Sequence, residues 1–502
     1  MTCLIGMSCV AISQNDIDAI RYSRIGVGGG ARFMAMGGSF GALGADISCM
    51  SYNPAGLGIY TKGEMIISGG MRFTNNRTKF EDAQSNILGA NFVFGNFGMA
   101  FAMPSEKDPE RRNVFGFSNN QILNMENQFV VNNGETTSSL AKDMLINAND
   151  IKNLSQFNPT YELLGYNSYI LDYDSAAGNY FSFVDLKRAH QLSRDVSQKG
   201  RINEMSFTFA QSVKDNFYFG ISLGIPRVKF ESTTTHSEND LNDSMNVTLT
   251  SSSTFTSTYV DGLPLIYLDK LGFHALQYQE YFKTTGYGLN LKIGGVFRAN
   301  KYARFGAYLH TPTVLYLTDT YYYYMKGVFD ANTDQAAEAQ YPDEQGLYEY
   351  RITTPMRYGF SGAFILNKYG ALNVDFERMS YKTTSLYSEN PSDFEGVNSV
   401  IKSKYKATGN LRIGAEVNLK PIMLRAGYAY YGSPFGGMFK GPFDRQSASL
   451  GIGYRTPNNL FIDLALIRMI SKEHYYLYSN IPSKVDLNLV NTTLMISVGA
   501  KF

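Results

Sequence analysis

The chain has 502 residues, enough for two to four ordinary domains, but its composition hardly changes from Glu64 to Phe502, so we expect one large domain. Apolar residues make up 44% and charged residues 18%, with 47 Gly, 36 Tyr and 34 Phe, a profile typical of a large β-protein with little charge for a water-facing surface. A net charge of +1, without any basic cluster interleaved with aromatic residues, excludes nucleic acid as a partner.

Residues 1–13, MTCLIGMSCVAIS, look like the end of a secretory signal peptide, because an apolar run precedes the small-x-small site Ala11-Ile12-Ser13. The basic start of such a peptide is missing. An alternative interpretation makes Cys9 a lipidated cysteine, although Gly6-Met7-Ser8 is a poor approach to one. Cleavage after Ser13 would leave Cys49 as the only cysteine, which excludes an internal disulfide framework.

Residues 14–61 form a second segment, which is rich in glycine and has no regular apolar period, as in ADISCMSYNPAGLGIY (45–60). It is too long for a simple tail and too rich in glycine to form a core of its own. We expect Asn53 to hydrogen-bond a turn and Pro54 to fix a kink. The other residues of interest here are Gly37, Gly38, Ala55, Gly56 and Leu57.

Residues 62–502 carry apolar side chains at every second position, as in 411–419 and 494–502. Such alternation fits a soluble β-sandwich, whose apolar face is the core, or a membrane barrel, whose apolar face meets lipid. We predict an all-β fold of fourteen antiparallel strands, over 63–79, 84–95, 97–119, 201–213, 216–232, 282–299, 302–324, 349–367, 370–387, 403–419, 421–433, 443–456, 459–478 and 486–502.

Connection lengths favour the barrel. Very short turns, such as Gly95-Asn96-Phe97-Gly98 and Thr456-Pro457-Asn458-Asn459, alternate with long segments at about 105–200 and 233–280. Outer-membrane barrels have short periplasmic turns and longer external loops, and an even strand count places the C-terminal end beside the short turns. No run of 18 apolar residues predicts a membrane-spanning helix.

Charges within the predicted strands fall mostly on the polar face, which would line the lumen. They are Arg72, Lys292, Arg298, Arg304, Arg357, Arg412, Glu416, Arg425 and Asp463. We interpret them as groups for hydration and ion pairing rather than as a ligand site, because a charge facing mid-bilayer lipid would cost about 2–4 kcal/mol. Tyr321 to Tyr324 would belong to an external aromatic girdle.

The leading segment resembles the FadL/TodX-type outer-membrane transporters of hydrophobic compounds. The resemblance lies in Arg21-Tyr22-Ser23, Gly28 to Arg32, Ala35 to Asp46 and Asn53-Pro54-Ala55-Gly56-Leu57. It implies that residues 14–61 are a hatch inside the barrel. It also implies passive uptake of hydrophobic small molecules, such as long-chain fatty acids or aromatic compounds. Glycine-rich leads of this style resemble Bacteroidetes-type versions, among which haemin receptors and type IX secretion shuttles are the alternative functions.

The resemblance also implies a lateral exit through the wall at the third strand. Proline cannot donate to a strand ladder, so Pro104 and Pro226 are the candidates for such a break. An ordinary strand end is the alternative for Pro104. External helices would form a first capture surface or only cap the barrel mouth, and the helical spacing in the long loop nominates Leu140, Met144, Leu145, Ala148, Ile151 and Leu154.

Catalysis is not expected. The five histidines, His190, His236, His274, His310 and His474, share no metal-ligand spacing, and no nucleophile motif or phosphate loop is visible. We therefore expect no enzyme activity, no metal and no cofactor, with haem ligation by external His or Tyr residues as an open alternative. The expected partners are a hydrophobic small molecule or lipid, outer-membrane lipid and lipopolysaccharide, with secretion or surface proteins as alternatives.

Overall fold

The structure of the chain is a computed structural model. It describes residues 15–24, 26, 28–104, 110–241, 245, 257–260, 263–266, 272–329, 336–436 and 443–502. The predicted signal peptide therefore lies outside the described residues.

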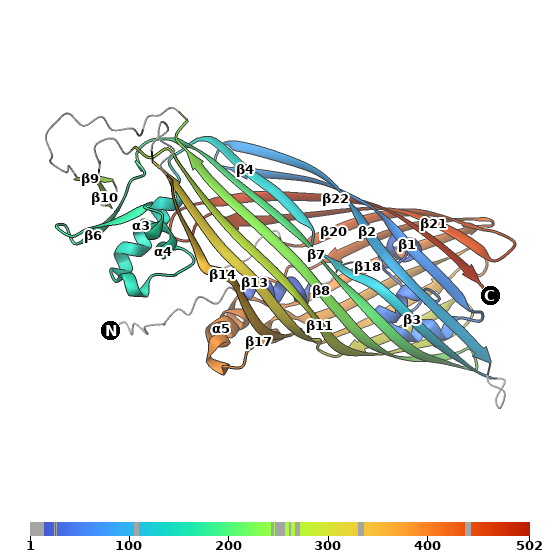
Figure 1. Cartoon of the computed structure of the whole chain (residues 1–502). Coiled ribbons are helices and arrows are strands. Elements are labelled where there is room, and N and C mark those ends of the chain that lie inside the picture. Colours follow the sequence, from blue (N-terminus) through green and yellow to red (C-terminus); the bar gives the residue numbers. More distant parts are fainter. Residues whose placement is uncertain are drawn as a thin grey trace.

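One antiparallel sheet of eighteen strand segments forms the wall, and it closes because β1 pairs with both β2 and β22. Four wall strands consist of two segments each, so fourteen strands surround the lumen, as predicted (Figure 1). The segments are β1 (Glu64–Phe80), β2 (Ala83–Pro104), β3 (Arg111–Asn124) with β4 (Asn127–Thr136), β7 (His190–Val213), β8 (Phe217–Asn239), β11 (Ala275–Arg298), β12 (Ala303–His310) with β13 (Val314–Val328), β14 (Ala336–Thr353) with β15 (Arg357–Ile365), β16 (Gly370–Ser380) with β17 (Ser385–Tyr387), β18 (Ala407–Leu419), β19 (Ile422–Tyr431), β20 (Arg445–Arg455), β21 (Leu460–Tyr476) and β22 (Lys484–Lys501).

The two faces of the wall follow the predicted alternation. On β21, Ile462, Leu464 and Leu466 point outward and are exposed, whereas Asp463 points inward and is fully buried. None of the nine strand charges expected in the lumen is exposed. The outside therefore offers an apolar band to lipid, as in transmembrane barrels.

Several predicted boundaries are wrong. The strand predicted over 349–367 begins at Ala336, and the loop predicted over 233–280 is shorter, because β8 runs to Asn239 and β11 begins at Ala275. Gly95 to Gly98 is not a turn, because β2 runs through it without a break. The third strand does not cover 97–119, because its first segment begins only at Arg111 and its second ends at Thr136. The long external loop is accordingly shorter than 105–200, since much of that range belongs to β3, β4 and β7.

Beyond the external end of the barrel lies a small dome. It contains α3 (Leu140–Ile151), the 3₁₀ helix η3 (Leu154–Gln156), α4 (Glu162–Asn167) and a four-stranded sheet of β5 (Leu171–Asp174), β6 (Asn179–Ser182), β9 (Ser257–Val260) and β10 (Leu263–Ile266). A large apolar cluster joins α3 and α4 to buried side chains at the external ends of β4, β7, β11 and β22. A second external element, after η4 (Tyr381–Thr383), consists of η5 (Pro391–Phe394) and α5 (Glu395–Lys404).

The described residues between Asn15 and Thr61 lie inside the barrel (Figure 1). They form α1 (Asp16–Ser23), α2 (Ala31–Ala35) and the 3₁₀ helices η1 (Ile47–Ser51) and η2 (Pro54–Ile59). We call this segment the hatch. Helix α1 lies toward the external end, and the segment leaves at the other end, where Gly63 and Phe502 exchange backbone hydrogen bonds. Of the helices in the described residues, none has the length and apolarity needed to cross a membrane.

Candidate functional site: the hatch and the β2–β4 seam

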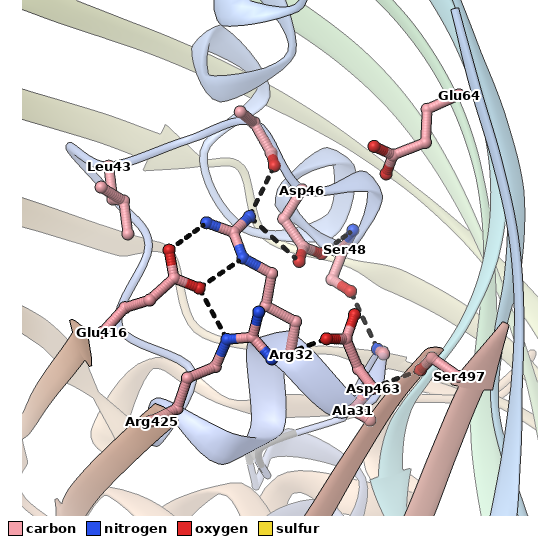
Figure 2. A network of polar contacts seen from close by, with 12 residues as sticks. Ala31, Arg32, Leu43, Asp46, Ser48, Glu64, Glu416, Arg425, Asp463 and Ser497 are labelled. Carbon is pink, nitrogen blue, oxygen red and sulfur yellow. Dashed lines mark hydrogen bonds and ion pairs between the residues drawn. The ribbon is translucent and has the colours of Figure 1, made fainter. Parts of the chain in front are cut away.

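Ion pairs fasten the hatch to the wall (Figure 2). The guanidinium of Arg32 donates to both carboxylate oxygens of Glu416, over 3.1 and 3.2 Å, and to the carbonyl of Ala45 over 2.7 Å. Glu416 also accepts from Arg425, whose other nitrogen reaches the buried Asp463 at 2.7 Å. A buried charge is tolerated only when it is paired. Removal of one member of this network would therefore leave another charge buried without a partner, which strongly lowers the free energy of unfolding.

Wall side chains also hold the hatch backbone. Asp375 on β16 accepts from the amides of Phe40 and Gly41, and Ser497 on β22 accepts from the amide of Ala31. Gly37 and Gly38 have φ angles of +64° and +75°, a conformation that favours glycine. The middle of the hatch is therefore fixed to two separate parts of the wall, β16 and β22.

The Asn53-Pro54 kink packs against the wall at β11 and β8. The Asn53 side chain accepts from the amide of Ala55 over 3.2 Å and donates to the carbonyl of Gly41 over 2.6 Å. Pro54 then opens η2. A Cβ atom at Gly294 would lie 1.8 Å from the Asn53 oxygen, so the kink and the wall strand are in direct contact. Ala55, Gly56 and Leu57 are all buried within η2.

The external end of the hatch is held by α5. Asp16 accepts from the Lys404 ammonium over 2.7 Å and from the Tyr405 hydroxyl over 2.5 Å. Burial, together with the bond to Asp16, raises the pKa of the Tyr405 phenol, which keeps it protonated as the donor. The Tyr22 hydroxyl donates to Thr284 on β11 over 2.8 Å. Both ends of the hatch are thus attached to the barrel.

The ladder between the second and third strands is interrupted in its external part. The β2–β3 ladder runs from Pro104↔Arg112 to Asn96↔Asn120 and then stops. The third strand is irregular between Gln121 and Leu123 and continues as β4, which pairs only with β7. The rest of β2 pairs only with β1. We call the unpaired edges of residues 83–95 and 127–136 the β2–β4 seam.

A cavity of about 70 Å³ lies behind the inner part of this seam, between the hatch and the wall. It combines apolar groups with three side-chain amides, one hydroxyl and two guanidinium groups. Its lining residues are Gly26, Gly28, Gly29, Met34, Arg72, Val93, Phe94, Gly95, Gln121, Leu123, Asn124, Arg445, Ile467, Met469, Asn491, Thr493 and Met495. On the lipid side of the same stretch of β2, Leu88 and Phe92 are each 71% exposed.

The two prolines nominated from the sequence lie elsewhere. Pro104 is the last residue of β2, not a residue of the third strand, so its predicted position was wrong. Pro226 lies within β8 and pairs with Glu204 on β7, while the β8–β11 register omits Ile225 and Pro226 before it resumes at Gly224. Pro226 lines a second cavity of about 50 Å³ beside Tyr22 and Ser51. Neither proline lies at the β2–β4 seam.

The helix nominated as a capture surface faces inward. Leu140, Met144, Leu145 and Ala148 are at most 1% exposed and belong to the core of the dome. Ile151 is half-buried against that core, and Leu154 is the one exposed member of the set. The apolar face of the helix therefore packs onto the barrel strands and the rest of the dome instead of facing outward.

The β2–β4 seam was not predicted because no strong sequence signal identifies it. Two residues of β1 that contact its β4 edge, Asn76 and Thr78, occur in the polar run TNNRT, at alternate positions that the barrel pattern assigns to the lumen. Among the described residues no group of three His, Cys, Asp or Glu side chains is arranged to hold a metal ion.

Comparison with solved structures shows the fold. The chain is similar to a Pseudomonas aeruginosa FadL homologue, with 14% identity, coverage of 96% of this chain and 99% of that one, and a TM-score of 0.53. It is also similar to the P. putida toluene transporter TodX, with 12% identity, 95% and 99% coverage and a TM-score of 0.52. A third similar structure is that of the Ralstonia pickettii toluene transporter TbuX, with 16% identity, coverage of 95% of this chain and 99% of that one, and a TM-score of 0.50.

Neither the comparison with protein-family models nor that with curated protein sequences gives a match. The similarity to the three solved structures confirms the resemblance to FadL/TodX-type transporters at the level of the barrel fold, over nearly the whole chain.

Proposed function

We propose that the protein is an outer-membrane channel for passive uptake of hydrophobic small molecules, with exit through the β2–β4 seam into the membrane. The observation that supports this most directly is the interrupted ladder with a largely apolar cavity behind it. Leu88 and Phe92 on the lipid side extend the apolar path outward. The known transport of toluene by proteins of this fold adds support.

The hatch directs the cargo sideways in this proposal. The attachment of its middle to the wall through Arg32 and Asp375 supports a segment that obstructs the direct route along the barrel axis. Binding need only be moderate. Burial of about ten methylenes at about 0.8 kcal/mol each gives roughly 8 kcal/mol, which corresponds to about micromolar affinity before entropy costs. Capture and release are then both feasible.

Uptake of radiolabelled oleate and radiolabelled toluene by cells that express the protein tests the proposal. Thr493 lines the cavity and is half-buried, so Thr493→Trp should fill the space and lower uptake about tenfold. The matched control Thr493→Val keeps the size of the side chain and should retain wild-type uptake. A wild-type protein that imports neither compound contradicts the proposed function.

A further inference from the structure

The free edge of β4 is satisfied by side chains instead of by a neighbouring backbone. Asn76 on β1 donates to the carbonyl of Gln128 over 2.7 Å, and Thr78 donates to the carbonyl of Val130 over 2.6 Å. The amide of Asn132 donates to the Ser85 hydroxyl over 3.1 Å. Three successive alternate residues of β4 therefore each have a side-chain partner on the β1–β2 hairpin.

The parity of these contacts identifies the edge. In an antiparallel strand the N–H and C=O of one residue point to the same side, and successive residues alternate between sides. Residues 128, 130 and 132 share one parity, so their polar groups all lie on the edge of β4 that faces away from β7. That edge is the one that would pair with β2 in a continuous wall.

The donors on β1 are placed so that they reach the free edge of β4. Asn76 and Thr78 are 1% and 3% exposed and project inward, past β2, to the backbone of β4. Two further contacts start from β1: Asn76 reaches the Asn127 side chain at 3.1 Å, and Arg72 reaches Asn124 at 2.5 Å. The second segment of the third strand is thus drawn toward the lumen side of β1 and β2.

We propose that Asn76, Thr78 and Ser85 form a side-chain ladder that occupies the free edge of β4 in place of the β2 backbone, and so keeps the seam without a backbone ladder and available for cargo. An unpaired strand edge otherwise tends to complete its hydrogen bonds with the nearest backbone, which here is β2. The three residues act as positioning residues for the seam. This inference rests on the proposed function for its consequence in transport, but its structural part can be measured separately.

The test is the double variant Asn76→Leu with Thr78→Val, which keeps side-chain size and removes both donors. The freed carbonyls should then pair with β2. Hydrogen–deuterium exchange of the protein in nanodiscs should slow at least about tenfold over 83–95 and 127–136, because unpaired amides gain partners. Oleate uptake should fall at least about fivefold. Thr78→Val alone should show both changes to a smaller extent.

Thr208→Val is the matched control. The Thr208 hydroxyl is also buried and donates to Ser222 over 2.8 Å, but it lies on the continuous β7–β8 ladder. It should leave exchange at the seam and uptake unchanged. Exchange at the seam that stays the same or becomes faster in the double variant overturns the inference. Slower exchange with unchanged uptake supports the ladder and contradicts lateral exit in the proposed function.

Discussion

Two seams of the same barrel are built differently. The β7–β8 register is unbroken from Gln191↔Asn239 to Val213↔Phe217. The second seam, between β2 and the third strand, has a ladder only from Asn96↔Asn120 to Pro104↔Arg112. Side chains complete what the backbone leaves unpaired there. A barrel can thus stay closed as a whole while one seam lacks a continuous ladder, provided that a neighbouring strand satisfies the free edge.

Proline substitution should show the largest difference between the seams. Val228 pairs on both sides, with Ile202 and Gly286, so Val228→Pro must remove a ladder bond and should cost about 3 kcal/mol or more. Val130→Pro removes only an N–H on the seam edge of β4 and should be tolerated. Heat-modifiable mobility in electrophoresis reports the folded fraction. Equal loss of folded protein in both variants would mean that the seams are not different.

Amide exchange of the unmodified protein sharpens the comparison. The amide of Val130 lies on the seam edge, whereas Val228 is paired with both neighbouring strands, β7 and β11. We expect the Val130 amide to exchange at least about 100-fold faster, because its opening needs no disruption of a ladder. Residue-resolved exchange in nanodiscs measures the ratio. Similar protection at both amides would indicate that β4 already pairs with β2 in solution.

Two glycines of the hatch allow the same comparison from inside the barrel, because Gly28 lies beside the third strand and Gly58 lies beside β7. A Cβ at Gly28 would lie 1.7 Å from the carbonyl of Gln121, beside the break in the third strand. Gly28→Ala must displace that backbone and should lower the free energy of unfolding by about 1–3 kcal/mol. At Gly58, beside β7, the closest atom would be the Gln211 carbonyl at 3.3 Å, so Gly58→Ala should cost about 0.5 kcal/mol. Urea unfolding in detergent compares the two, and a Gly58→Ala cost equal to that of Gly28→Ala would refute the difference.

The sequence predicted the strand number and the two faces of the wall because period-two alternation is imposed by lipid on every strand. Ile462, Leu464 and Leu466 follow it without exception. The positions of the lumen charges followed from the same pattern. Arg412, Arg425 and Asp463 are all buried inside.

The turn predicted at Gly95 to Gly98 was wrong because its glycines have another role. Gly95 to Gly98 has the composition of a turn, yet it continues β2. A Cβ at Gly95 would lie 2.9 Å from the carbonyl of Gly29, and one at Gly98 would lie 2.5 Å from Ile47, so these glycines admit the hatch rather than reverse the chain. Such close approach depends on a segment far away in the sequence.

The segment that forms β4 was assigned to a loop for a related reason. Its sequence NQFVVNNGET has no row of apolar side chains that faces lipid. Phe129 and Val131 pack into the dome, and the edge of β4 away from β7 contacts β1. Lipid does not impose alternation there. The inward position of Leu140 and Met144 was likewise not predictable, since helical spacing gives an apolar face but not the surface that covers it.

The network around Arg32 has a further consequence, for the movement of salt. Arg32, Arg425 and Arg455 meet Glu416, Asp463 and Asp46, so the fixed charges in that cross-section balance one another. A hydrated ion finds no row of like charge to follow and would have to break buried pairs to pass. These six groups therefore carry no net charge in that cross-section, and under the proposed function hydrophobic compounds could enter the cell without a charged path for small electrolytes.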